Sequence, residues 1–188
     1  PTAIGETFVA DPKMDKGLTC FVVILGIGIA AVFSSGFIPA LRDLTMIIVA
    51  LMFLAAGITA SGADAYLLHV TTTPSVAYVA RTEGFDCGIM ISASHNPYYD
   101  NGIKLLNGNG EKMDDETICL IEDFLDGKSG IPPYALREKI GRTVDYIEGR
   151  NRYIGYLISL GLYSFKGKKI ALDCANGSAA TTAPILFD

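Results

Sequence analysis

The hydrophobic pattern of the chain is regular from residue 57 onward and predicts alternating helices and strands. Short apolar runs predict strands, whereas apolar residues three or four positions apart predict helices, and glycine, proline and Asn-Gly steps separate them. The predicted elements, in chain order, are an irregular start or a short strand at 7–10, the end of a helix at 56–61, a strand at 65–70, a helix at 74–81, a strand at 89–91, an extended run at 103–104, a hairpin at 105–113, a helix from 114 or 115 to 126, a loop at 128–141, a helix beginning at 145 or its neighbour, and a strand at 170–173. This order predicts an α/β fold, in which helices pack on a mixed sheet.

Residues 17–63 form two stretches without formal charge, separated only by Arg42 and Asp43. By length each stretch could cross a bilayer, for which about 20 apolar residues suffice. Several glycines and Pro39 interrupt the first stretch, which favours a β-rich segment at 20–29 followed by a turn. The link between the stretches is very short, and no cluster of lysine or arginine flanks them. We therefore expect buried core here, and a membrane hairpin is the alternative interpretation.

Composition limits the classes of function. The 188 residues suffice for one domain, or for one domain and a piece of another, and half of them are hydrophobic. The net charge of −5 is spread without a basic tract, which argues against a nucleic-acid partner. The cysteines lie far apart and predict reduced, packed thiols of a cytoplasmic protein, with neither a zinc site nor a disulfide framework. They are Cys20, Cys87, Cys119 and Cys174.

The candidate chemistry lies in the loop that follows the predicted strand at 89–91. Ser94 and His95 stand in a small-residue loop, and Asn101 begins a second turn that returns the chain to an extended run through Lys104. Ser94 and Lys104 could therefore face one pocket. A phosphoserine carries about −1.5 to −2 charges at pH 7 and needs basic or metal partners, so this arrangement favours phosphoryl chemistry.

Three alternatives remain open on the residues alone. Ser94 could be a hydrolytic nucleophile, but sequence neighbours tend to point apart, so we expect His95 to be badly placed as its base, and no Gly-x-Ser-x-Gly elbow is present. The loop could also be a simple polar turn. The Asn-Gly steps at 107–110 could form a phosphate cradle, but no helix starts at those glycines, so a hairpin is favoured.

The segment Ile-Ser-Ala-Ser-His-Asn-Pro-Tyr-Tyr-Asp-Asn-Gly-Ile-Lys at 91–104 resembles the active-site serine loop of the α-D-phosphohexomutase superfamily, most of all its phosphoglucosamine mutase branch. The resemblance implies an intramolecular phosphotransferase that interconverts glucosamine 6-phosphate and glucosamine 1-phosphate. Its implied site residues are Ser94 as the phosphorylated carrier, His95 and Lys104 for phosphate contact and proton transfer, and Asn96 and Asn101 for substrate binding. The alternatives are a phosphoglucomutase or phosphomannomutase, and a non-catalytic membrane-associated module with residues 17–63 in lipid.

The likeness covers roughly residues 57–188, and the Asp-Cys-Ala-Asn-Gly turn at 173–177 resembles the opening of the family's second domain. It implies a first domain at 1–164 and, at 165–188, the first strand and turn of a second α/β domain. Residues 1–55 do not match the family pattern, and the family's phosphate-holding arginine has no counterpart there. The resemblance implies Mg²⁺, bound here through the phosphate of Ser94, while the family's aspartate loop is missing from this chain. We therefore expect the chain to be inactive without the C-terminal domains of the same enzyme.

Overall fold

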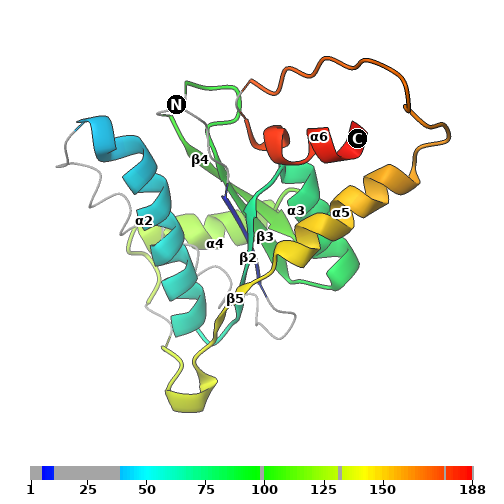
Figure 1. The fold of residues 1–188 in the computed structure, drawn as a ribbon. Helices are drawn as coiled ribbons and strands as arrows, with labels where there is room; N and C mark the ends of the chain where they lie inside the picture. Colours follow the sequence, from blue (N-terminus) through cyan, green and yellow to red (C-terminus); the bar gives the residue numbers. More distant parts are fainter. Residues whose placement is uncertain (1–5, 11–38, 98–99, 131–132, 176, 188) are drawn as a thin grey trace.

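The structure is a computed structural model that describes residues 6–10, 39–97, 100–130, 133–175 and 177–187 (Figure 1). Its helices and strands follow the predicted order closely. They are β1 (Glu6–Ala10), α2 (Pro39–Ala60), β2 (Ala65–Val70), α3 (Thr73–Glu83), β3 (Cys87–Ser92), β4 (Gly102–Asn107), α4 (Asp115–Leu125), the 3-10 turn η1 (Arg137–Lys139), β5 (Thr143–Asp145), α5 (Ile147–Ser159), the 3-10 turn η2 (Ser178–Thr181) and α6 (Ala183–Phe187).

The strands form one mixed sheet in the order β4-β3-β1-β2-β5. Strand β1 pairs antiparallel with both β2 and β3, so β2 and β3 run parallel to each other on either side of it. Strand β4 is antiparallel to β3, and β5 is parallel to β2. The predicted α/β class with a mixed sheet is therefore confirmed. Because β2 and β3 point the same way, the loops that follow them meet at one edge of the sheet.

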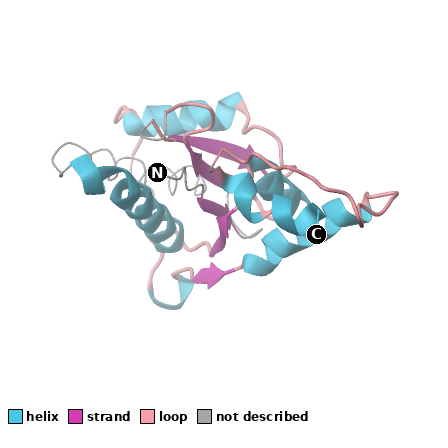
Figure 2. Ribbon diagram, turned by 45° about the horizontal axis from the view of Figure 1, so that its top comes forward, coloured by secondary structure: helices cyan, strands magenta, loops and turns pink. Residues whose placement is uncertain are grey.

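Helices cover both faces of the sheet, as Figures 1 and 2 show. On one face, α2 packs with its buried Leu54 and Ile58 against Ile89 of β3, and Ile118 of α4 packs on the same cluster. On the other face, Val76 and Val79 of α3 pack against Met90. Successive residues of β3 thus enter opposite cores, as expected for a strand that is covered on both sides.

Helix α2 corrects the prediction for the apolar N-terminal stretches. It runs without a break from Pro39 to Ala60, so Arg42 and Asp43 lie inside a helix and do not form a link between two segments. Both residues are compatible with a helix interior, and proline is tolerated in a first turn. No helix in the described part of the chain has the length and apolar character to span a bilayer. The β-rich segment predicted at 20–29 lies outside the described residues.

Several predicted boundaries move by one residue or a few. Helix α3, predicted at 74–81, begins one residue earlier, with Thr72 at the N-cap position, and ends at Glu83 before Gly84, whose φ of 72° is left-handed. Helix α4 begins as predicted, with the Asp114 carboxylate accepting a 2.8 Å hydrogen bond from the Thr117 amide. The predicted hairpin at 105–113 is a turn closed by a single bridge between Leu106 and Lys112.

One strand near the C-terminal end was not predicted, and one prediction there is wrong. Helix α5 begins next to Asp145 as predicted, with Tyr146 at its N-cap position, but residues 143–145 before it pair with β2 as the short strand β5, which the sequence did not predict. Residues 170–173 are not a strand, since they find no partner strand among the described residues, and an apolar run forms a strand only where its backbone groups can pair. The turn into a helix after this segment is present as η2 and α6. Among the described cysteines, Cys87, Cys119 and Cys174 form no disulfide, but the predicted packing holds only for the buried Cys87, since Cys119 is exposed and Cys174 half-buried. Cys20 lies outside the described residues.

Candidate active site

A pocket of about 370 Å³ opens where the loops after β2 and β3 meet. Its size falls within the range of small-molecule sites, roughly 300–1,000 Å³. The described residues that line it are Thr72, Thr73, Pro74, Met90, Ser92, Ala93, Ser94, His95, Lys104, Gly177 and Ser178. None of these is a carboxylate, and one is a lysine, so the described lining favours an anionic ligand.

Ser94 stands at the tip of the loop after β3, in a conformation that non-glycine residues adopt rarely. Its φ is 56°, in the left-handed region. Two contacts hold the loop: the Ser94 amide donates to the Ser92 hydroxyl at 3.3 Å, and the Asn96 amide donates to the Ala93 carbonyl at 2.9 Å. Ala93 itself is buried. Backbone strain of this kind persists where the surroundings fix it, and it is concentrated at functional sites.

Lys104 reaches Ser94 from the neighbouring strand β4. In the β3–β4 register Lys104 lies opposite Met90, and both residues line the pocket. The Lys104 ammonium donates to the Ser94 hydroxyl over 3.4 Å, which is long for a hydrogen bond and leaves room for the pair to tighten around a ligand. The structure therefore brings Ser94 and Lys104 to the same pocket.

His95 corrects one expectation about this loop. Its Nδ1 lies 3.3 Å from the Ser94 hydroxyl, so the two neighbours do not point apart. The left-handed φ of Ser94 breaks the alternation that an extended chain would impose. A hydrolytic triad would also need a carboxylate to orient the imidazole, and the described lining of the pocket contains none.

The remaining predicted residues lie elsewhere, and others take part that the sequence analysis missed. Asn96 is exposed, and neither it nor Asn101 lines this pocket. Thr72 and Thr73, which were not among the predicted site residues, line it from the amino end of α3. The signal was available, since these threonines follow β2 as Ser94 follows β3. The contribution of Ser178, from a segment far along the chain, had no such signal.

The described residues do not by themselves form a metal centre. No group of three or more histidine, cysteine, aspartate or glutamate side chains gathers among them. A larger hollow of about 750 Å³ lies between the end of α5 and α6, but its described lining is mainly apolar and contains no histidine, cysteine or carboxylate. The chemistry-bearing residues are therefore those of the Ser94 pocket.

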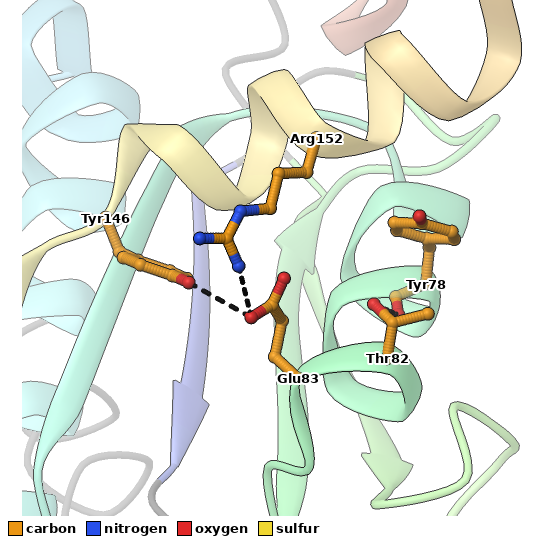
Figure 3. Close-up of polar contacts among 5 residues, drawn as sticks. All are labelled: Tyr78, Thr82, Glu83, Tyr146 and Arg152. Carbon is orange, nitrogen blue, oxygen red and sulfur yellow. Dashed lines mark hydrogen bonds and ion pairs between the residues drawn. The ribbon is translucent and has the colours of Figure 1, made fainter. Parts of the chain in front are cut away.

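Paired side chains anchor the carboxyl end of α3, at the far end from the pocket (Figure 3). The Tyr146 hydroxyl donates to the Glu83 carboxylate at 3.3 Å, and the Arg152 guanidinium of α5 donates to the same oxygen. Partial burial, and then the charge of Glu83, raise the pKa of Tyr146. The hydrogen bond to Glu83 raises the pKa of Arg152. These contacts tie α3 to α5 and so fix the helix whose other end lines the pocket.

Comparison with known proteins gives a family model and several similar proteins. Residues 49–130 match the model described as "Phosphoglucomutase/phosphomannomutase, alpha/beta/alpha domain I". A phosphoglucosamine mutase of Lachnospira eligens is 70% identical over 135 residues, which cover 72% of this chain and 30% of that protein. Phosphoglucosamine mutases of Lachnoclostridium phytofermentans and Streptococcus pneumoniae are 65% and 48% identical, over 72% and 71% of this chain and 30% of each relative.

The chain thus spans about 30% of the length of these relatives. The matched region contains the sheet from β2 to β4, the helices α3 and α4, and the whole serine loop. The resemblance that the serine loop predicted is confirmed: residues 49–130 match the first domain of the phosphohexomutases, and the chain is similar to phosphoglucosamine mutases.

Proposed function

We propose that this chain supplies the phosphoserine domain of a phosphoglucosamine mutase, with Ser94 as the covalent carrier of the phosphoryl group. The observation that supports this most is the position of the Ser94 hydroxyl, 3.4 Å from Lys104 at a pocket whose described lining has no carboxylate. The names of the relatives favour an amino-sugar phosphate over glucose or mannose phosphates as the substrate. They also favour an enzyme over a membrane-associated module. A cytoplasmic location remains a prediction.

In the proposed reaction Ser94 carries the phosphoryl group between two positions of the sugar. The bond from phosphorus to Ser94 Oγ breaks while a bond forms to the 1-hydroxyl oxygen of glucosamine 6-phosphate. The proton of that hydroxyl passes to His95 or Lys104 in its neutral form. The bisphosphate then reorients in the site. Ser94 Oγ takes the phosphoryl group from the 6-oxygen, the 6-oxygen recovers the proton, and glucosamine 1-phosphate leaves. Where His95 takes the proton, Lys104 keeps its positive charge and balances the charge on the transferring group.

The described pocket residues account for neither a complete Mg²⁺ site nor all of the proposed substrate contacts. A phosphate on Ser94 would offer oxygen ligands of the kind that Mg²⁺ prefers, but the described pocket residues add no carboxylate, so the steps above involve this chain's residues alone. Asn96 and Asn101 are proposed to contact substrate only when it extends beyond the pocket, because they do not line it.

We also propose that residues 1–164 form the first domain and residues 165–188 begin a second. Leu162 and Tyr163, next to this boundary, are 88% and 86% exposed. Together with the apolar hollow between α5 and α6, they form the kind of exposed apolar surface that a further domain covers. The unpaired segment at 170–173 would find its partner strand in the same domain.

The test of the proposed function is phosphorylation of Ser94. The chain is incubated with a hexose 1,6-bisphosphate and examined by intact mass and peptide mapping. We expect a gain of about 80 Da in the peptide that contains Ser94, and no gain in Ser94→Ala. A chain that never acquires this mass contradicts the proposal. A coupled assay should detect little or no glucosamine 1-phosphate from this chain alone, and robust turnover would overturn that expectation.

A further inference from the structure

The turn that leads from β2 into α3 carries hydroxyl groups that make no hydrogen bond within the described part of the protein. Thr71 and Ser75 are fully buried, and their hydroxyl oxygens have no partner there. Thr72 and Thr73, between them, are half-buried and line the Ser94 pocket. Buried polar groups are nearly always paired, so a run of unbonded hydroxyls needs a physical reason.

Thr72 is an N-cap threonine whose hydroxyl does not cap its helix. It is the N-cap of α3, where a threonine hydroxyl normally accepts a hydrogen bond from an amide of the first turn. Thr72 has the extended backbone of an N-cap, with φ of −91° and ψ of 155°, yet its side chain makes no capping bond. Its hydroxyl is therefore available to a ligand in the pocket.

The electrostatics of this wall of the pocket favour an anion over a cation. The amino end of a helix carries partial positive charge, although in α3 Pro74 has no amide hydrogen and the Ser75 amide already donates to the Thr72 carbonyl at 3.0 Å. Lys104, which lines the same pocket, adds a full positive charge 3.4 Å from the Ser94 hydroxyl. A cation bound by the same hydroxyls would meet repulsion from both. A phosphate would instead accept hydrogen bonds from these hydroxyls and from the Lys104 ammonium.

We propose that Thr72 and Thr73 are phosphate-binding residues, whose hydroxyls donate to the phosphate oxygens in the Ser94 pocket and hold the group between α3 and Lys104. This inference rests on the proposed function for the identity of the phosphate, which is the one carried by Ser94. It adds a binding wall formed by the loop after β2.

The test uses inorganic phosphate and the unphosphorylated chain, so that it does not depend on catalysis. Phosphate is titrated into the protein, and the dissociation constant is followed by NMR through the amide shifts of the 92–97 loop. We expect Thr72→Val and Thr73→Val each to weaken binding about fivefold, the effect of one neutral hydrogen bond. Thr73→Ser, which keeps the hydroxyl, should restore binding. The matched control is Thr82→Val on the same helix, whose hydroxyl donates to the Tyr78 carbonyl away from the pocket.

The outcomes separate this inference from the proposed function. Unchanged phosphate affinity in both valine variants overturns the inference, and so does a wild-type chain that binds no phosphate. Phosphorylation of Ser94 could still occur in either case. In another outcome, the valine variants lose phosphate affinity, Thr82→Val and Thr73→Ser keep it, and Ser94 never becomes phosphorylated. The threonines then do bind phosphate, whereas the proposed role of Ser94 as covalent carrier is contradicted. Ser94→Ala should retain most of the affinity for inorganic phosphate, because it removes only one hydroxyl from the pocket.

Discussion

The two ends of helix α3 use polar side chains in opposite ways. At the carboxyl end Glu83 accepts hydrogen bonds from Tyr146 and Arg152, and the Thr82 hydroxyl donates to the backbone (Figure 3). At the amino end the Thr72 and Thr73 hydroxyls make no hydrogen bond within the described residues, although both threonines line the same pocket as a strained serine and a lysine. The first end satisfies its polar groups internally, and the second leaves them open.

This difference separates stability from binding along one helix. A satisfied cluster lowers the free energy of the fold, whereas open hydroxyls cost stability until a ligand pairs with them. Substitutions at the carboxyl end should therefore change the free energy of unfolding and leave phosphate affinity alone. Substitutions at the pocket should do the reverse.

The largest effect is expected at the pocket, in Lys104→Met. The variant removes the ammonium beside Ser94 and should weaken inorganic phosphate binding on the order of tenfold, because hydrogen bonds to charged groups contribute about 1.5–3 kcal/mol and this lysine is exposed. Its free energy of unfolding should stay within about 0.5 kcal/mol of the wild type. The matched control is Lys112→Met, which removes an equally exposed ammonium that pairs only at 3.8 Å with Asp115. If both variants lost phosphate affinity equally, the loss would reflect the net charge of the protein and not a contact of Lys104 in the pocket.

Next in size is Glu83→Ala, at the other end of the helix. It leaves the Tyr146 hydroxyl and the Arg152 guanidinium without their shared acceptor, and it should lower the free energy of unfolding by about 1–2 kcal/mol in a urea titration. Phosphate affinity should not change. Thr82→Val, one position away, should cost less than about 0.5 kcal/mol, because its hydroxyl is exposed. A loss of phosphate affinity in Glu83→Ala would show that the two ends are coupled and not separate.

Tyr146→Phe should lower the free energy of unfolding by a smaller amount, about 1 kcal/mol near neutral pH. The variant keeps the ring, which packs edge-on at 5.3 Å from Tyr66, and loses the bond to Glu83. Burial and Glu83 raise the pKa of Tyr146 in the fold, so the folded state holds this proton more tightly than the unfolded state. Its contribution is complete below the ordinary tyrosine pKa of about 10 and is lost as pH rises through the folded value. Unfolding measured between about pH 8 and pH 11 should therefore show the wild type approaching the variant at the alkaline end. If the difference in the free energy of unfolding between wild type and variant stayed constant across that range, the raised pKa of Tyr146 would be contradicted.

The sequence predicted those parts of the fold in which local signals and tertiary packing agree. The strand around Ile89–Ile91 and the helix from 114 or 115 both rest on short-range chemistry, and each is present. Strand β5 was missed because three residues show no periodicity and are strands only by pairing with β2. Residues 170–173 failed for the opposite reason, since they have the apolar pattern of a strand and no described partner.

The site was predictable as far as one loop and its return strand. Ser94 and Lys104 lie ten positions apart around a short turn, so sequence alone could bring them near each other. The contact of His95 with Ser94 was not predictable, because it depends on a left-handed residue at a position that is not glycine. Thr72 could have been expected at the pocket, because it follows β2 as Ser94 follows β3, whereas Ser178 enters the pocket through the return of the C-terminal segment, which no local pattern encodes.

The smallest effect on stability should come from the pair formed by His69 of β2 and Asp145 of the edge strand β5. The His69 Nε2 lies 2.8 Å from the Asp145 carboxylate, and this hydrogen bond lowers the pKa of Asp145. A lowered carboxyl pKa contributes stability above the ordinary aspartate value of about 4, and the contribution is lost as pH falls through the folded value. Because the carboxylate is 71% exposed, Asp145→Asn should lower Tm by no more than about 2 °C at neutral pH and by nothing near pH 2. In a His69→Gly background, where glycine suits the φ of 56°, Asp145→Asn should have no effect at either pH. A residual effect there would assign the role of Asp145 to the strand pairing of β5 and not to the histidine.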